Sequence, residues 1–292
     1  MGDRILRATA AGGNILAIAA DTRELVQKAF ELHHTMPVAT AALGRLLTAG
    51  AIMATQQKGE NDLLTLKIEG DGPLKGIVVT ANSKSQVRGF VYHPETNLAL
   101  KPNGKLDVSG AIGNGTLTVI KDMGLKEPYV GKTLLQTGEI AEDLTYYYMA
   151  SEQIASSVGL GVLVDRDYSV RQAGGFLIQL MPFATEEVIL RLEENLKNIS
   201  SVTALMEEGK STEEILALIL DGLDLNISQE IVPEYVCNCS KKRIEKALIS
   251  LGREEITGMI EDGETIEIHC DFCNQYYYYT VEELKELLVS AR

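Results

Sequence analysis

The sequence predicts an α+β fold in three parts. These are an N-terminal mixed, largely antiparallel sheet packed with helices, then a helical linker, then a small C-terminal domain that binds zinc. Strand-like and helix-like runs mix without regular alternation up to about residue 183. Residues 184–230 carry a net charge of −8, whereas residues 1–183 carry −1. All four cysteines lie after residue 236. We therefore place the domain boundaries at 1–183, 184–230 and 231–292.

The chain is predicted to begin with a β-hairpin, formed by residues 4–11 and 14–20 around Gly12-Gly13-Asn14. A helix should start at Asp21, with Glu24 completing a capping box. A second helix should start at Pro37, because proline suits the first helical turn. Its apolar face combines small and large residues at helical spacing: Ala42, Leu46, Ala49 and Met53. This composition indicates close packing against a sheet or another helix.

Strands and turns follow through the rest of the first domain. Strands are expected at Leu63–Ile68, Gly76–Thr80, Val87–Tyr92, Thr116–Ile120, Gly159–Asp165 and Gly175–Leu180, with turns at Gly70-Asp71-Gly72-Pro73 and Asn114-Gly115. A helix is expected from about Ile140 to Ala155. The glycines from Gly110 to Gly115 lack the order of a dinucleotide fingerprint and no Gly-Lys-Ser/Thr follows, so we interpret them as a strand turn.

Residues 184–230, which we call the acidic segment, are predicted to form short amphipathic helices. One runs from Thr185 to Ile199, and Ser211 with Glu214 forms a capping box before another. Such short helices are marginal alone and must bury an apolar stripe against another surface. The segment is either an ordinary helical subdomain or an element of low stability that detaches and exposes that stripe.

Residues 231–292 should hold a helix from Lys241 to Leu251, a strand at Thr265–Ile268 and a final helix capped by Thr280 and Glu283. Tyr276 to Tyr279 should form a strand that packs over the cysteines. About sixty residues form only a small core, so zinc is expected to supply much of the folding free energy of this domain.

The four cysteines form two close pairs, Cys237-Asn238-Cys239 and Cys270-Asp271-Phe272-Cys273, with residues 240–269 between them. Two such pairs supply four thiolates, the ligand set of a tetrahedral zinc site. In extended chain, Cys237 and Cys239 point to one face, with Cα atoms roughly 6.5–7 Å apart, at the upper limit of disulfide geometry. Oxidising that pair therefore requires the local backbone to change.

Alternatives to a redox-active zinc site are a permanent zinc ribbon and two extracellular disulfides. Lys241, Lys242 and Arg243 follow Cys239 and are expected to lower the pKa of nearby thiols. His269 could replace a thiolate, but on a strand it faces away from Cys270 and is expected to be a neighbour. His33-His34, and the acidic group of Glu139, Glu142 and Asp143, are interpreted as helix-end residues.

Composition limits the function further. No basic patch exists to neutralise phosphates, so nucleic acid is not an expected partner. No apolar run is expected to approach the length of a membrane span, and the N-terminus does not resemble a signal peptide. We therefore expect a cytoplasmic protein, where thiols remain reduced. The sequence contains neither a Ser/His/Asp order nor a nucleophile elbow, and we do not expect an enzyme.

The chain as a whole resembles the bacterial thirty-three-kilodalton chaperonin family, the redox-regulated heat-shock holdases. The cysteine arrangement is the most specific motif. The resemblance runs the whole chain and rests on Gly70-Asp71-Gly72-Pro73-Leu74, Gly138 to Leu144, Ser151-Glu152-Gln153, Ala173-Gly174-Gly175 through Gln179 and Pro182, Tyr235 to Ser240, and Cys270 to Asn274.

The resemblance implies an ATP-independent holdase that binds unfolding client proteins and is active as a homodimer. Cys237, Cys239, Cys270 and Cys273 would bind Zn²⁺ in the reduced, inactive state. Oxidation would form the disulfides Cys237–Cys239 and Cys270–Cys273, release zinc and loosen the linker. The alternative functions are a thiol-disulfide oxidoreductase and a zinc-ribbon adaptor in transcription or translation, the latter disfavoured by the charge. From the spacings we further hypothesise that Cys270–Cys273 forms first.

Overall fold

The computed structural model describes residues 2–199 and 201–290. The chain forms two compact units, Met1–Val236 and Cys237–Arg292. The mixed α+β class predicted from the sequence is confirmed. The three-part division at residues 183 and 230 stays a prediction.

The first unit contains two sheets. The five-stranded sheet has the order β10 (Asn226–Ile231), β1 (Arg4–Ala10), β2 (Ile15–Asp21), β9 (Val170–Leu180) and β8 (Ser156–Val164). The six-stranded sheet has the order β11 (Glu234–Tyr235), β5 (Gln86–Val91), β4 (Gly76–Asn82), β3 (Leu63–Gly70), β6 (Gly115–Asp122) and β7 (Tyr129–Leu134). Neighbouring strands are antiparallel except β11 and β5.

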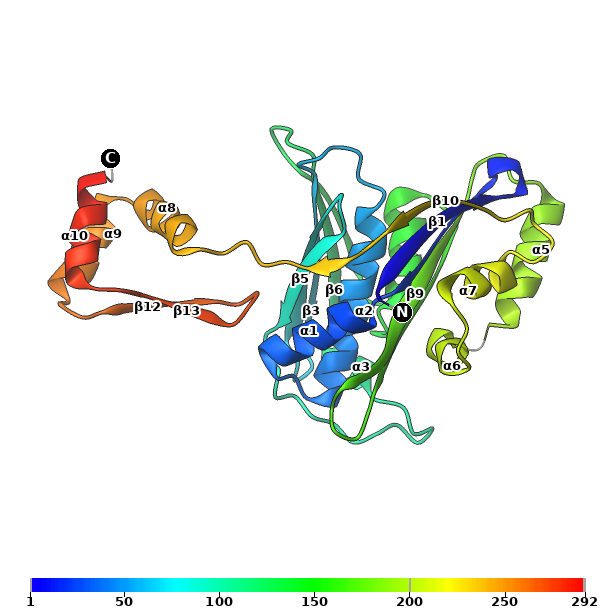
Figure 1. Cartoon of the computed structure of the whole chain (residues 1–292), viewed down its shortest axis with the longest axis horizontal. Helices are drawn as coiled ribbons and strands as arrows, with labels where there is room; N and C mark the ends of the chain where they lie inside the picture. The colour runs from blue at the N-terminus through cyan, green and yellow to red at the C-terminus, as the bar shows by residue number, and fades with distance from the viewer. Residues whose placement is uncertain (1, 200, 291–292) are drawn as a thin grey trace. The chain divides into compact units, whose positions relative to one another are not determined.

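Helix α2 (Pro37–Ala54) runs between the two sheets (Figure 1). Its side chains are buried almost all round, and they join strands of both sheets in one core. The small residues predicted for this helix allow the close approach, since a Cβ at Gly50 would lie 2.8 Å from Val79 Cγ1. Around this core lie α1 (Arg23–His33), α3 (Val108–Ile112), α4 (Ala141–Tyr147) and a π-helical turn η2 (Tyr148–Glu152). The short turn η1 (Ala11–Gly13) joins β1 to β2, and its Ala11 N–H donates to the carbonyl of Leu223 at 2.6 Å.

Of the described helices, α2 alone is long and apolar enough to cross a membrane. The prediction that no apolar run approaches the length of a membrane span is therefore wrong for these 18 residues. The helix is the core of the first unit, and 89% of its apolar window is buried there. A buried core helix meets the same criteria of length and composition, so the run is no sign of a membrane span.

The predicted capping box of the first helix is wrong. Helix α1 starts at Arg23 rather than Asp21, and Thr22 makes no side-chain cap. Instead Asp3, from the start of the chain, accepts hydrogen bonds from the backbone N–H groups of Glu24 (2.8 Å) and Leu25 (2.7 Å). Burial raises the pKa of Asp3 from 3.8 to about 6, against the opposing effect of those two hydrogen bonds.

We expect Asp3 to make stability depend on pH. Because the folded chain binds this proton more tightly than the unfolded chain does, the stability of the wild type relative to Asp3→Asn should rise as the pH falls from about 6 to 4. The full change is about 3 kcal/mol for a shift of about two pKa units. Urea unfolding of both proteins at several pH values measures it. A pH-independent difference between them would contradict the assignment.

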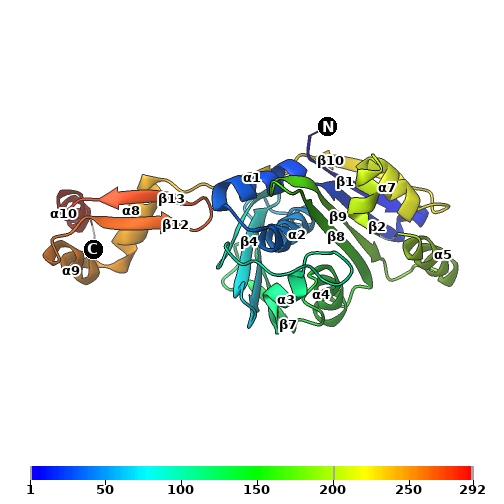
Figure 2. The same cartoon turned by 90° about the horizontal axis from the view of Figure 1, so that it is seen from below.

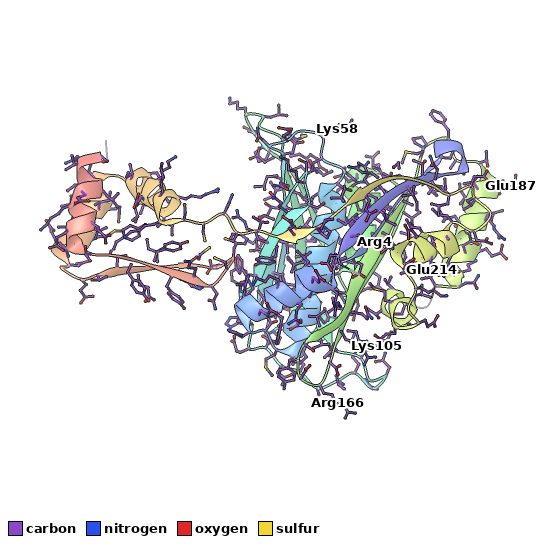
Figure 3. The ribbon with its side chains drawn as sticks, viewed as in Figure 1. Arg4, Lys58, Lys105, Arg166, Glu187 and Glu214 are labelled. Carbon is purple, nitrogen blue, oxygen red and sulfur yellow. The ribbon has the colours of Figure 1, made fainter. Side chains whose placement is uncertain are left out.

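The acidic segment covers the outer face of the five-stranded sheet with α5 (Glu186–Lys197), α6 (Val202–Glu207) and α7 (Thr212–Ile219) (Figures 1 and 2). The predicted capping box is confirmed, because Glu214 N–H donates to Ser211 Oγ and Ser211 N–H donates to Glu214 Oε2. Apolar residues of these helices form a second core with β1, β2 and β9; they include Leu192, Val202, Met206, Ile215, Leu216 and Ile219. Their acidic side chains, such as Glu187 and Glu214, are exposed (Figure 3).

The segment after α7 joins the two sheets. Strand β10 pairs with β1, and β11 then pairs in parallel with β5. The Tyr235 hydroxyl donates to the carbonyl of Gly89 at 2.8 Å, and Val236 N–H donates to the carbonyl of Val87 at 2.9 Å. Neither strand was predicted from the sequence. The chain is thus fixed to the first unit up to the residue before Cys237.

The second unit contains α8 (Lys241–Leu251), α9 (Arg253–Glu261), β12 (Ile266–Cys270), β13 (Gln275–Tyr279) and α10 (Val281–Ser290). Helix α9 was not predicted, whereas the cap formed by Thr280 and Glu283 is confirmed by hydrogen bonds in both directions. Among the described residues, this unit has only four buried apolar side chains: Leu248, Tyr279 and Leu284 form one cluster, and Ile256 of α9 is the fourth.

Two further expectations for the first unit need correction. The helix predicted for residues 140–155 is α4 followed by η2, and it ends at Gln153, whose φ is +57°. Residues 108–112 form the short helix α3, capped by Asp107, where a simple strand turn was expected. Strand β7 was not predicted either.

Candidate metal centre

The two cysteine pairs meet in the second unit. Cys237 and Cys239 lie just before α8, Cys270 ends β12, and Cys273 lies in the turn that leads to β13. Their four Sγ atoms all lie within 4.8 Å of one another, and all four cysteines are partly buried. The predicted cluster is therefore brought together, although residues 240–269 separate its two pairs in the sequence.

The distances suit a tetrahedral site. Cys237 Sγ lies 3.8 Å from Cys270 Sγ, and Cys239 Sγ lies 3.2 Å from Cys273 Sγ. Four sulfurs at the usual Zn–S length would lie about 3.8 Å apart. Each of these two contacts joins a cysteine of the first pair with a cysteine of the second pair. The four sulfurs therefore form one cluster rather than two separate pairs. The donor set and its spacing fit zinc.

A tight turn presents the second pair. The backbone N–H groups of Cys273 and Asn274 donate to the carbonyl of Cys270, at 3.2 and 2.8 Å. Asn274 has φ = +59°, which allows the chain to reverse into β13. The N–H of Phe272 donates to Cys270 Sγ and that of Gln275 to Cys273 Sγ, and both bonds lower the pKa of their thiol. Backbone dipoles thus favour thiolate sulfur at both positions.

The four thiols are not equivalent. Burial disfavours the Cys239 thiolate, but hydrogen bonds from the Tyr277 hydroxyl and the Cys273 thiol outweigh burial and lower the pKa of Cys239 to about 7. Burial, and then the hydrogen bond to Cys239, raise the pKa of Cys273. Burial also raises the pKa of Cys270. The cluster therefore favours negative charge first on Cys239.

Tyr277 is a part of the site that was not singled out from the sequence. Its hydroxyl donates to Cys239 Sγ at 3.1 Å, and this bond raises the pKa of Tyr277 itself. The run from Tyr276 to Tyr279 was predicted to be a strand over the cysteines, and β13 confirms the strand. Side chains alternate along a strand, so Tyr277 shares one face with Tyr279, which is buried in the core. This alternation is the sequence signal that could have identified Tyr277.

His269 lies beside the cluster rather than in it. Its Nε2 is 2.6 Å from Asn274 Oδ1, its Nδ1 is 3.3 Å from Asp271 Oδ1, and its ring packs against Tyr276. The two polar partners lie in the turn between β12 and β13, so these contacts hold the imidazole at that turn. The prediction that His269 is a neighbour of the cysteines is consistent with this geometry.

The basic residues after Cys239 do not produce the thiol shift that was expected of them. Lys241 is ion-paired with Glu283, and its ammonium lies 5.2 Å from the centre of the Tyr279 ring. Lys242 and Arg243 are exposed. The lowered pKa of Cys239 comes instead from the hydroxyl and thiol hydrogen bonds that reach its sulfur.

Other residues considered from the sequence lie elsewhere. Glu139 precedes α4 and accepts from Arg45 at 2.7 Å and from Lys101, which makes it a part-buried ion cluster rather than a helix-end charge. Asp143 does cap α4, by accepting from the N–H of Ile140 at 3.0 Å. His33 Nε2 lies 3.1 Å from the Tyr235 hydroxyl in the first unit.

Comparison with known proteins agrees with the fold and the cluster. A family model described as Hsp33 protein matches residues 3–280. The chain is 54% identical over 287 residues to a 33 kDa chaperonin of Agathobacter rectalis, covering 98% of this chain and all of that protein. It is 53% identical over 291 residues to one of Lachnoclostridium phytofermentans, covering both chains entirely.

Among solved structures, the crystal structure of the 33 kDa chaperonin of Thermotoga maritima matches with a TM-score of 0.92 and 36% identity. The match covers 99% of each chain. The predicted family resemblance is therefore confirmed over both units. The chain belongs to the Hsp33 family of chaperonins.

Proposed function

We propose that the protein is a redox-regulated, ATP-independent holdase that keeps unfolding proteins from aggregating. One observation carries the proposal. An acidic, amphipathic segment buries an apolar sheet face, and the chain continues from it through β10 and β11 directly into a four-thiol cluster. A chemical change at the thiols can therefore be linked to exposure of apolar surface. The family membership and the chaperonin names of the relatives support this function.

In the reduced state, Cys237, Cys239, Cys270 and Cys273 would hold one Zn²⁺. When bound, zinc supplies four bonds that tie the start of α8 to the β12–β13 hairpin, in a unit whose own core is small. Tyr277 donates to Cys239, and the turn amides donate to Cys270 and Cys273. These donors stabilise sulfur in its charged form.

Oxidation would pair Cys237 with Cys239 and Cys270 with Cys273. Each disulfide forms with loss of two protons and two electrons, which a peroxide accepts as its O–O bond breaks. The short contacts in the reduced structure join Cys237 with Cys270 and Cys239 with Cys273. The proposed disulfides therefore require the cluster to rearrange, so the oxidised protein cannot retain the reduced fold at this site.

Rearrangement next to Cys237 would act on the preceding chain. Strand β11 has only two residues and holds the end of the first unit through a few backbone bonds and the Tyr235 hydroxyl. If β11 and β10 release, α5 to α7 lose the chain that follows them. The apolar face that they cover then becomes available to an unfolding client.

The proposal also includes the clients, the oligomeric state and the compartment of the protein. Clients are unfolded or partly unfolded proteins, the active form is a homodimer, and the compartment is the cytoplasm. A thiol-disulfide oxidoreductase is the alternative, but its Cys-x-x-Cys should open a helix after a strand. Here the pair runs from the last residue of β12 into the turn before β13.

The test of the function is aggregation of a heat-unfolded client, followed by light scattering with reduced and with peroxide-treated protein. Released zinc is measured in parallel with a colorimetric chelator. Suppression of aggregation only after oxidation, together with zinc release, is expected. Equal activity before and after oxidation would contradict redox regulation, and turnover of a small disulfide substrate would favour the oxidoreductase.

The order of disulfide formation is a further prediction. Cys270 and Cys273 share one tight turn, whereas Cys237 and Cys239 are expected to need a backbone change before they can pair. We expect Cys270–Cys273 to accumulate first during peroxide treatment at low temperature, and Cys237–Cys239 to follow on warming. Mass spectrometry of alkylated thiols measures both. Early accumulation of Cys237–Cys239 at low temperature would show that the order is reversed.

A further inference from the structure

Tyr277 connects two parts of the second unit that are far apart in the sequence. It lies in the middle of β13, where the strand pairing places it opposite Ile268 of β12. Its hydroxyl donates to Cys239 Sγ at 3.1 Å, and Cys239 lies 38 residues earlier, in the segment before α8. The bond therefore links the hairpin that presents the second cysteine pair to the segment that carries the first.

This donor differs from the donors on the second cysteine pair. The sulfurs of that pair accept from the backbone N–H groups of Phe272 and Gln275, which belong to the same turn as the sulfurs or to the residue that ends it. Such donors move with their sulfur when the turn changes shape. Tyr277 is held by the β12–β13 pairing instead, so Cys239 can move away from the hairpin only after its hydrogen bond breaks.

The hydroxyl of Tyr277 has a second acceptor within reach. Oε1 of Gln275, on the same strand, lies 3.2 Å from it. The single hydroxyl proton serves one acceptor at a time, and a thiolate is the stronger acceptor because its hydrogen bonds are charge-assisted. A disulfide sulfur carries no charge and attracts the proton only weakly. The proton therefore belongs to Cys239 in the reduced cluster, and Gln275 can accept it once that sulfur is oxidised.

Formation of the Cys237–Cys239 disulfide uses both sulfurs as thiolates. One thiolate attacks an oxygen of hydrogen peroxide, the O–O bond breaks, and a sulfenic acid and hydroxide form. The other thiolate then attacks the sulfenic sulfur, so that the S–S bond forms and a second hydroxide leaves. Two electrons pass from the sulfurs to the peroxide oxygens. Cys239 is the attacking thiolate in one of these steps, so a hydrogen bond that stabilises its charge slows the sequence.

The same bond also opposes the movement that this disulfide requires. Both close contacts of Cys239 Sγ, with Tyr277 and with Cys273, are to the β12–β13 hairpin and the turn within it. In a disulfide with Cys237, this sulfur would lie about 2.05 Å from a sulfur of its own segment. It must therefore exchange its contacts with the hairpin for a bond to its neighbour, and the contact with Tyr277 is one that has to be lost.

We propose that Tyr277 is a positioning residue that sets the oxidant threshold of the cluster. Its hydroxyl holds the Cys239 sulfur on the hairpin and makes Cys237–Cys239 the slow disulfide. The proposal rests on the proposed redox regulation and names the side chain that controls it. The delay lasts while β13 is in place, so brief oxidation without unfolding stress leaves the first pair reduced. Because Gln275 can accept the proton afterwards, the hydroxyl slows oxidation without losing its partner in the oxidised protein.

Two phenylalanine variants of the full chain test the proposal. Tyr277→Phe removes only the hydroxyl that donates to Cys239. Tyr279→Phe is the matched control, because the Tyr279 hydroxyl lies on the same face of β13 and donates at 2.9 Å to the carbonyl of Lys241, close to Cys239 in the sequence. Each variant loses one bond between β13 and the chain around the first cysteine pair, but only Tyr277→Phe loses a bond to sulfur. Zinc content and amide exchange verify that both variants fold.

Each reduced, zinc-loaded protein is treated with peroxide at low temperature, and alkylated thiols are followed by mass spectrometry. We expect Tyr277→Phe to form Cys237–Cys239 about tenfold faster relative to the other disulfide than the wild type does, as for the loss of one hydrogen bond to a charged group. Tyr279→Phe should keep the wild-type ratio of the two rates. In the cobalt-substituted proteins, the thiolate-to-metal absorption band should move to longer wavelength in Tyr277→Phe alone, because its sulfur holds more electron density.

An unchanged ratio of rates or an unmoved band in Tyr277→Phe would overturn the proposal. The same change of ratio in Tyr279→Phe would also overturn it, because the effect would then come from the attachment of β13 and not from the sulfur. These results differ from a failure of the function itself. If peroxide forms neither disulfide in the wild type, the redox regulation is wrong and this proposal fails with it. If the wild type is oxidised and releases zinc but Tyr277→Phe keeps its ratio, this proposal alone is wrong.

Discussion

Replacing Cys270 by serine is expected to abolish tight zinc binding and to unfold residues 237–292, while the first unit remains folded. The four sulfurs form one cluster, so loss of one leaves three ligands. Among the described residues, the second unit has only four buried apolar side chains, Leu248, Ile256, Tyr279 and Leu284. Structural zinc sites contribute about 10–16 kcal/mol in small domains, more than such a core can replace.

Competition with a colorimetric chelator measures zinc affinity and stoichiometry, and amide exchange read by mass spectrometry measures folding in each unit. His269→Ala is the matched control, because its imidazole contacts Asn274 and Asp271 rather than a thiol. We expect one zinc per chain in the wild type and in this control. An unchanged zinc affinity in Cys270→Ser would refute the four-thiolate site.

Replacing Ile219 by aspartate is expected to give a chaperone that is active while reduced. Ile219, the last residue of α7, is fully buried in the core between the acidic segment and the sheet. Losing its side chain there costs about 2–5 kcal/mol, and a buried carboxylate without a partner adds to this. Helices as short as α6 and α7 have little stability of their own to offset the loss. The segment should therefore detach with zinc still bound.

Leu218→Asp, one position earlier on the same helix, is the matched control, because Leu218 is 41% exposed. For Ile219→Asp we expect amide protection to be lost across residues 185–226, with retained protection in β3 to β6 and full zinc content. Client aggregation should be suppressed without oxidant, whereas Leu218→Asp should still require it. A variant that loses protection in the segment yet stays inactive when reduced would show that uncovering this face is not the activating step.

The sequence predicted those features of the fold that depend on residues close together in the chain. The β1–β2 hairpin, the strands β3 to β6 and the caps at Ser211 and Thr280 depend on residues a few positions apart. The thiol cluster was predictable because metal geometry restricts how two close cysteine pairs can meet. The apolar stripe of the acidic segment indicated burial, although not which sheet face it covers.

Features that depend on distant partners could not be predicted in this way. Strand β10 is mostly exposed and has no strong apolar alternation, and its partner β1 lies at the opposite end of the first unit's sequence. Asp3 caps α1 from the start of the chain, ahead of β1, so the residues next to the helix gave a false capping box. Tyr277 was assigned to a strand, but contact with Cys239 depends on how the hairpin folds onto α8.

The pairing of β1 with β10 also determines how the chain can fold as it is synthesised. Strand β1 can pair with β2 at once, but its other edge waits for residues 226–231. At about 5–20 residues per second, the ribosome needs roughly 10–40 s to make the intervening stretch. The helices that cover the same sheet are also among the last parts of the first unit to emerge. During translation this chaperone therefore passes through the condition of its own clients, with an open strand edge and an uncovered apolar face.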